Sequence, residues 1–193
     1  FSDKKIIHEK FPKITFSDSM LKYGTDKPDL RNPLIINDLT EIFKRKDVSF
    51  DIFKKLVSKG SIVRGIVTKN TKDRPRSFFD GIDKWAKEQG ASGLAYFTIE
   101  KDPEIKAKGP VGKFFSSDSL SEIMKISNAE AGDSIFLACG KTSEVETIHS
   151  MARDKIANDL KLVDENSLKV LINNFSTTLK ISSCSTKDIS KSN

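Results

Sequence analysis

Two adjacent stretches decide the fold class: Pro75-Arg-Ser-Phe-Phe-Asp-Gly-Ile-Asp-Lys-Trp-Ala-Lys-Glu-Gln-Gly90 and Gly93-Leu-Ala-Tyr-Phe-Thr-Ile-Glu100. In the first, Pro75 suits the opening turn of a helix and Gly90 suits its end. Its large apolar residues recur at helical spacing and form one stripe: Phe78, Phe79, Ile82, Trp85 and Ala86. The second stretch is rich in residue types that favour strands. The pair therefore predicts a helix whose apolar stripe packs on a sheet.

Further elements are expected on both sides of this pair. Thr15 and Ser116 or Ser117 are suitable helix N-caps, and Gly24 is a suitable C-cap. We expect helices over 16–23, from Asp38 to about Arg45, over 117–127 and over 141–160. We expect strands over 34–36 and 134–139, an antiparallel hairpin from 50–57 and 61–69, and a Gly/Pro/Lys loop over 101–113.

Composition favours one folded domain with a highly charged surface. The chain has 193 residues, of which 37% are apolar and 31% charged, with a formal net charge of +6. This mild basic excess permits a nucleic-acid partner without requiring one. No stretch approaches the roughly 20 apolar residues of a membrane helix, and the N-terminus lacks a signal-peptide pattern. We therefore expect a cytoplasmic protein with no membrane partner.

The sequence contains no recognisable set of catalytic or metal-binding residues. Two histidines, His8 and His149, and two cysteines, Cys139 and Cys184, are too sparse for a zinc site and match no nucleophile–base pattern. Both histidines are expected to be surface residues. The stretch 106–113 superficially resembles a phosphate-binding loop but lacks its spacing, so a solvated basic turn is the simpler interpretation. We predict no catalytic, cofactor-binding or metal-binding residue.

One long motif carries a family resemblance. The run Phe11-Pro-Lys-Ile-Thr-Phe-Ser-Asp-Ser-Met-Leu-Lys-Tyr-Gly-Thr-Asp-Lys-Pro-Asp-Leu-Arg-Asn-Pro33 closely resembles a segment of bacterial-type aspartyl-tRNA synthetases. The resemblance continues, in the family's order, through Gly90-Ala-Ser-Gly-Leu-Ala-Tyr96, Lys108-Gly-Pro-Val-Gly-Lys-Phe114 and Ala131-Gly-Asp-Ser-Ile-Phe136. It covers about residues 1–175.

The resemblance implies the GAD-type domain that is inserted into the class II catalytic domain of these enzymes. The implied fold is α+β, an antiparallel sheet with helices packed on it. The implied organisation is a flank and connecting loop over 1–33, the inserted domain over 34–165, and a diverged tail over 166–193. The Ser/Thr-rich composition of the tail favours disorder.

The same resemblance implies a function only for the intact enzyme, namely ATP-dependent attachment of aspartate to tRNA. The residues that bind ATP, magnesium and aspartate in the family lie outside this segment, so the chain alone is expected to be inactive. The implied partners are the remainder of the synthetase and, through it, tRNA. The candidate interdomain or RNA contacts are Asp26, Lys27, Asp29, Arg31, Lys106, Lys108 and Lys113.

Other interpretations remain open at this point. The loop of Asp26 to Arg31 also fits a structural turn held by local hydrogen bonds. The chain could be a free-standing RNA- or protein-binding module, or a non-functional fragment. It opens at Phe1 in a Lys-rich stretch, as an excised piece would, and it departs from the family pattern at Ser176. A frame change or a degraded gene copy would produce such a departure.

Overall fold

The computed structural model describes residues 5–6, 13–163, 167–173 and 180–182. Its centre is a five-stranded antiparallel sheet in the order β3-β4-β7-β5-β6. The strands are β3 (Ile36–Asp38), β4 (Ile62–Thr68), β5 (Ala95–Lys101), β6 (Ile105–Lys108) and β7 (Ser134–Gly140). The expected α+β class, an antiparallel sheet with helices packed on it, is confirmed.

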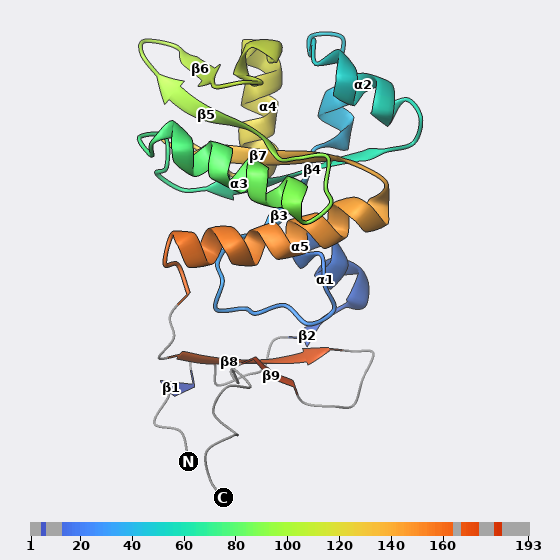
Figure 1. Ribbon diagram of the computed structural model, residues 1–193, viewed down its shortest axis with the longest axis vertical. Helices are drawn as coiled ribbons and strands as arrows, with labels where there is room; N and C mark the ends of the chain where they lie inside the picture. Colours follow the sequence, from blue (N-terminus) through green and yellow to red (C-terminus); the bar gives the residue numbers. More distant parts are fainter. Residues whose placement is uncertain (1–4, 7–12, 164–166, 174–179, 183–193) are drawn as a thin grey trace, which may run out of the picture.

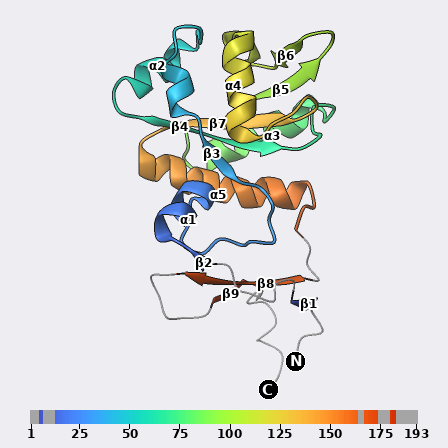
Figure 2. The ribbon, with the colours of Figure 1, turned by 180° about the vertical axis from the view of Figure 1, so that it is seen from behind.

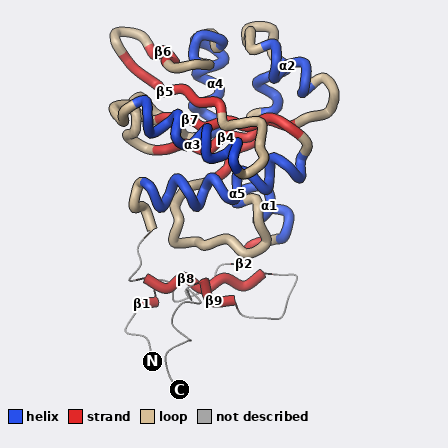
Figure 3. The backbone as a smooth tube through the Cα atoms, in the orientation of Figure 1, coloured by secondary structure: helices blue, strands red, loops and turns tan. Residues whose placement is uncertain are grey.

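Helices cover both faces of this sheet (Figures 1 and 3). They are α1 (Phe16–Tyr23), α2 (Asp51–Val57), α3 (Arg76–Glu88), α4 (Ser117–Ser127) and α5 (Thr142–Asp159), with 3-10 helices η1 (Thr40–Lys44) and η2 (Gly112–Phe114). Successive side chains of a strand point to opposite faces, so each strand supplies two cores. On β7, Ile135 and Leu137 pack with the η1, α2 and α4 side, whereas Phe136 and Ala138 pack with α3 and α5.

Short strands at the two ends of the chain lie beyond α5, at the opposite end of the molecule from β6 (Figures 1 and 2). They are β1 (Lys5–Ile6), β2 (Lys13–Ile14), β8 (Ser167–Asn173) and β9 (Lys180–Ser182). Both β1 and β2 pair with β8 in parallel, and β9 pairs with it antiparallel. The segment that leads into the central domain therefore lies beside the segment that leads out.

Several helix boundaries follow the sequence signals. The Thr15 hydroxyl accepts the Asp18 N–H at 3.0 Å, and Gly24 adopts a left-handed conformation at the end of α1. Ser116 caps α4 by accepting the Ser119 N–H at 3.0 Å. Pro75 immediately precedes α3. The hydroxyl groups of Thr15 and Ser116 satisfy N–H groups that have no partner inside the helix, which explains why the predicted starts of α1 and α4 are confirmed.

The predicted hairpin is wrong in its first half. Residues 51–57 form α2, because Phe50, Phe53 and Val57 fall on one helical face and pack into the core. On the same helix, the Lys54 ammonium donates to the carbonyls of Arg45 and Val48, both at 2.8 Å. The aromatic and β-branched content of this stretch therefore reflects burial against the sheet.

Four other predictions need correction. The expected strand over 34–36 lies at Ile36–Asp38, and the helix after Asp38 is the 3-10 helix η1. The expected loop over 101–113 contains β6, where Ile105 and Ala107 alternate with exposed Lys106 and Lys108 and pair with β5. The expected disordered tail, 166–193, contains β8 and β9, which pair with each other. The remaining tail residues lie outside the described ranges.

Substitution of the central strand should identify the main core. Leu137→Ala removes a fully buried side chain from β7, so we expect the free energy of unfolding to fall by about 2–5 kcal/mol. Ile52→Ala is the matched control, because Ile52 is 65% exposed on α2 and should change stability by less than about 0.5 kcal/mol. Urea unfolding followed by circular dichroism measures both. Equal losses would contradict this assignment of the core.

Candidate functional site

The loop over 24–33, which supplies four of the candidate contacts, is docked on α5. Gly24 ends α1 with φ 69°, and its N–H donates to the Met20 carbonyl at 3.0 Å. A Cβ atom at this position would lie 2.5 Å from the Glu146 carbonyl oxygen of α5. Only glycine permits both the backbone conformation and this close approach. The end of α1 is therefore in direct backbone contact with α5.

Asp29 and Arg31 form a pair within the loop. The Asp29 carboxylate accepts the Arg31 backbone N–H at 2.9 Å and its guanidinium Nη2 at 2.6 Å. Both side chains are largely buried. Burial alone would raise the pKa of Asp29, but the hydrogen bonds and charge of Arg31, with the charge of Arg153, hold that pKa below its usual value. This arrangement is the turn held by local hydrogen bonds that the sequence left open.

A buried arginine of α5 ties the loop to the domain. Arg153 is 1% exposed, and its Nε donates to the Leu34 carbonyl at 2.6 Å. Its Nη2 donates to the carbonyls of Asp29 and Asn32 at 2.8 and 2.6 Å. The guanidinium lies 4.9 Å from the centre of the Tyr23 ring. One side chain therefore binds three loop carbonyls and the last residue of α1.

Asn32 returns the contact from the loop side. Its buried amide donates to the Arg153 carbonyl at 3.0 Å and to the Asp154 carboxylate at 3.2 Å. The amide oxygen accepts the Leu34 N–H at 3.0 Å. Arg153 and Asp154 are about 120 residues from Asn32 along the chain. The sequence therefore gave no signal that Asn32 and Arg153 belong to one network.

A second polar tie joins α1, β4 and α5. Arg64 lies on β4 with 5% of its surface exposed. Its Nη1 donates to the Met20 carbonyl at 3.2 Å, and its Nη2 lies 3.3 Å from a Glu146 carboxylate oxygen. Together with Arg153, this contact fixes α1 and the loop as parts of the same rigid unit as the sheet. We call this set, Arg64, Glu146, Arg153, Asn32 and Gly24, the junction.

His149 is buried beside the junction, so its prediction as a surface residue is wrong. Its Nδ1 lies 2.9 Å from the Val145 carbonyl, and burial is the main cause that lowers its pKa to about 4. The buried face of α5 follows helical spacing through Val145, Ile148, His149, Ala152, Arg153, Ile156 and Ala157. This helical spacing was the signal in the sequence that predicts burial of His149, but the charged residues between these positions hid it.

The remaining candidates lie elsewhere. Lys106 and Lys108 are on β6 and Lys113 is on η2, at the opposite end of the molecule from the loop (Figures 1 and 2). Lys108 binds Glu100 at 2.5 Å, and Lys106 lies 3.8 Å from Glu104. The seven predicted contacts therefore form two separate groups. Lys27 is exposed, and whether any of the seven contacts RNA or another domain stays a prediction.

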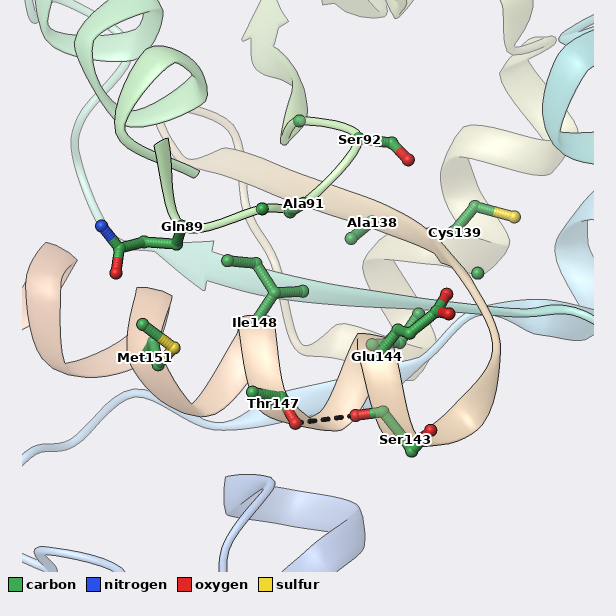
Figure 4. Close-up of a pocket in the computed structure, with 14 residues that line it drawn as sticks. Gln89, Ala91, Ser92, Ala138, Cys139, Ser143, Glu144, Thr147, Ile148 and Met151 are labelled. Carbon is green, nitrogen blue, oxygen red and sulfur yellow. Dashed lines mark hydrogen bonds between the residues drawn. The ribbon is translucent and has the colours of Figure 1, made fainter. Parts of the chain in front are cut away.

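A pocket of about 350 Å³ lies between the loop before β5, the end of β7 and the first half of α5. Figure 4 shows Gln89 and Met151 at one end and Cys139 and Glu144 at the other. The dashed line there joins the Thr147 hydroxyl to the Ser143 carbonyl, 2.8 Å away. Burial raises the pKa of Cys139 to about 11, so its thiol is protonated at neutral pH. Cys139 is therefore not an activated nucleophile.

Across the described ranges, the histidine, cysteine and acidic side chains form no group of three that could hold a metal ion. None of the helices described here is long and apolar enough to cross a lipid bilayer.

Comparison with known proteins gives one family match. The sequence profile of the GAD domain family matches residues 53–149, about half of the chain. These residues include four strands of the central sheet, from β4 to β7, with α3, η2 and α4 and parts of α2 and α5.

Three similar proteins are all named aspartate–tRNA(Asp/Asn) ligase. The protein of Pelagibacter ubique (strain HTCC1062) is 73% identical over 167 residues, which are 86% of this chain and 28% of that protein. That of Wolbachia sp. subsp. Drosophila simulans is 46% identical over 86% of this chain and 27% of its own length. That of Beijerinckia indica is 41% identical, with 84% and 27% covered. The chain thus spans just over a quarter of the relatives it matches.

The contact at Gly24 can be tested against a second glycine. Gly24→Ala should lower the free energy of unfolding by about 2 kcal/mol or more, since it combines a left-handed backbone with overlap against α5. Gly60→Ala is the control, because Gly60 has φ 93° but no heavy atom within 4 Å of an added Cβ. Urea unfolding at constant m-value compares them. A Gly60→Ala loss as large as that of Gly24→Ala would contradict the close approach.

The neutral state of His149 should make stability depend on pH. Its folded-state pKa is about 4, below the unfolded value near 6.5, so the unfolded chain binds the extra proton between these values. Stability from this group is complete above about pH 6.5 and is lost as pH falls towards 4, in total on the order of 3 kcal/mol.

Urea unfolding of the parent chain and of His149→Leu, each at pH 7 and pH 4.5, measures this dependence. The leucine variant should lose less stability between the two pH values than the parent. His8 is present in both proteins and cancels in the comparison. The pKa of Asp29 is held below its usual value, so protonation of Asp29 affects stability at pH values below the two that are compared. An equal loss in both proteins would show that His149 is not buried in its neutral form.

Proposed function

Because the chain belongs to the GAD domain family, we propose that it is the accessory GAD segment of an aspartate–tRNA ligase and has no active site of its own. The observation that carries the proposal is the 73% identity to the Pelagibacter ligase over 167 residues. That length exceeds the GAD match, so the likeness extends beyond the family domain into its flanks.

The two ends of the domain support an inserted position. Lys13 of β2 is in register with Ile172 of β8, and the two strands run in parallel. The chain therefore enters and leaves the central domain at neighbouring positions, as a domain inserted into another must. The junction then holds the entering segment, α1 and the loop, firmly against α5.

In this proposal the domain contributes position and surface, and the chemistry belongs to the rest of the ligase. ATP, magnesium and aspartate would bind outside this segment, and tRNA would be met as part of the whole enzyme. Asp29 and Arg31 serve the turn, so Lys27 and the β6 lysines are the better candidates for contacts with RNA or with another domain. Lys106 and Lys108 lie near acidic neighbours, which lowers the positive potential they can offer.

A chimeric enzyme tests the assignment. The matching 167-residue segment of the Pelagibacter ligase is replaced by that of this chain, and aspartylation of tRNA is measured. We expect a rate within about tenfold of the parent, a barrier difference of about 1.4 kcal/mol. The isolated chain should show no aspartate-dependent ATP–pyrophosphate exchange.

One control and three possible outcomes interpret the result. The Pelagibacter ligase without the segment shows how much activity the segment supports. A folded chimera without aspartylation, or exchange by the isolated chain, would contradict the proposal. Tight tRNA binding by the isolated chain, with affinity falling steeply as salt rises, would instead favour a free-standing RNA-binding module.

A further inference from the structure

An apolar groove lies at the β3 edge of the sheet. It has a volume of about 350 Å³ and lies where the segment before β3 meets the C-terminal ends of α4 and α5. The residues that line it include Pro33, Ile35, Lys69, Ile126, Asn128 and Leu162. Three of its apolar side chains are unusually accessible: Ile35 is 46% exposed, Ile126 is 42% exposed and Leu162 is 38% exposed. We call these three residues the edge patch.

The ends of two helices build the patch. Asn128 adopts φ 51° at the end of α4, and the Ala129 N–H then donates to the Met124 carbonyl at 3.0 Å. Lys161 adopts φ 55° after α5, and the Leu162 N–H donates to the Ala157 carbonyl at 2.8 Å. Both endings satisfy helix carbonyls while they turn the chain. Ile126 and Leu162 are thus presented by defined helix ends.

The groove has little charge to offer a partner. Lys69 is the one charged residue among those that line it. Its ammonium is already bound, to the Asn128 carbonyl at 2.6 Å and to an Asp133 carboxylate oxygen at 2.9 Å. A partner would therefore be recognised by apolar side chains, since burying exposed apolar surface is the main gain available here.

The position of the groove identifies its occupant. Pro33 and Ile35 directly continue the loop that leads in, and Leu162 lies on the segment that leads from α5 towards β8. We call the two places where the chain enters the domain, at β2, and leaves it, towards β8, the crossings. Leu162 thus lies on the segment that leads to the exit, and Pro33 and Ile35 follow the entering segment after α1 and the loop. The matched segment is 28% of the Pelagibacter protein, so most of such an enzyme lies beyond these crossings.

We propose that the edge patch is the surface on which the body of the ligase packs, through apolar side chains of its own, when the domain is in place. This inference rests on the proposed function. Three side chains bury far less than the roughly 800 Å² per partner of a stable complex between free proteins. Two covalent connections raise the effective concentration to the millimolar range, so a small patch is sufficient within one polypeptide.

A second exposed apolar pair provides the control. Ile52 and Leu56 are 65% and 37% exposed on α2, which lies at the other end of the molecule from β2 and β8 (Figure 1). They resemble the edge patch in chemistry and exposure but are far from both crossings. The proposal predicts that the ligase body covers the edge patch and leaves α2 open.

Methyl NMR with a soluble paramagnetic agent measures both surfaces in one spectrum. Isoleucine methyl groups are labelled in the isolated chain and in the chimeric ligase described above. In the isolated chain, the agent should relax Ile35, Ile126 and Ile52 strongly. In the chimera, relaxation of Ile35 and Ile126 should fall towards that of fully buried Ile135, and Ile52 should be unchanged.

Paired variants test whether the edge patch itself makes the contact. Ile126→Asp should leave the unfolding midpoint of the isolated chain near that of the parent but should restore relaxation of Ile35 in the chimera. Ile52→Asp should do neither. If Ile126→Asp unfolds the isolated chain, Ile35→Asp replaces it, with relaxation of Ile126 as the readout.

Each outcome separates the patch from the assignment to a ligase. An active chimera whose Ile35 and Ile126 stay as accessible as in the isolated chain would overturn the patch and leave the assignment standing. An inactive chimera with a covered patch would support the patch and count against the assignment. A patch already shielded in the isolated chain would also overturn the proposal, and dilution would then show whether a second copy or the chain itself covers it.

Discussion

The arrangement depends most on the buried guanidinium of Arg153. Removing a cation from water costs several kcal/mol unless its donors are satisfied, and burial does lower the pKa of this group. Three carbonyls of the connecting segment, those of Asp29, Asn32 and Leu34, accept its hydrogen bonds at 2.6–2.8 Å. Asp154, the nearest acid, is 3.6 Å away and mostly exposed. Backbone dipoles therefore provide most of the stabilisation, which makes the conformation of the loop and the burial of Arg153 mutually dependent.

This dependence explains the unusual content of α5. A helix against a sheet face normally buries an apolar stripe, yet α5 buries a histidine and an arginine within its stripe. Its apolar members, among them Ile148, Ala152 and Ile156, pack towards the sheet core formed by Phe136 and Ile66. Of the two polar members, Arg153 binds the connecting segment and Tyr23, and His149 interacts with Arg64 of β4. One helix thus joins two layers, an apolar one with the sheet and a polar one with the entering chain.

The sequence predicted the parts that local chemistry determines. Thr15, Gly24, Pro75 and Ser116 mark helix ends through hydrogen bonds or backbone angles that involve near neighbours, and the structure agrees with them. Errors arose where tertiary packing decides, as in 51–57, where residues typical of strands form a helix against the core. The alternation that marks β6 was present in Ile105-Lys-Ala-Lys108 but was hidden by the Gly and Pro residues after it. The junction could not be predicted, because Arg64 and Arg153 meet partners tens to more than a hundred residues distant.

The junction also limits where the domain could move relative to a larger enzyme. Releasing α1 and the loop from α5 would break the hydrogen bond of Arg64 to the Met20 carbonyl and would remove the three carbonyl partners of Arg153, so the cost is that of breaking several buried polar bonds together. Displacing the loop alone has a similar cost, because it breaks the hydrogen bonds of Asn32 to the Arg153 carbonyl and to the Asp154 carboxylate. Because of this energetic cost, residues 16–35 do not act as a hinge, and α1 moves together with the sheet. The orientation of this domain relative to the rest of the ligase is therefore determined by contacts outside residues 16–35. The two neighbouring crossings allow several orientations, and a small apolar contact such as the edge patch is enough to select one of them.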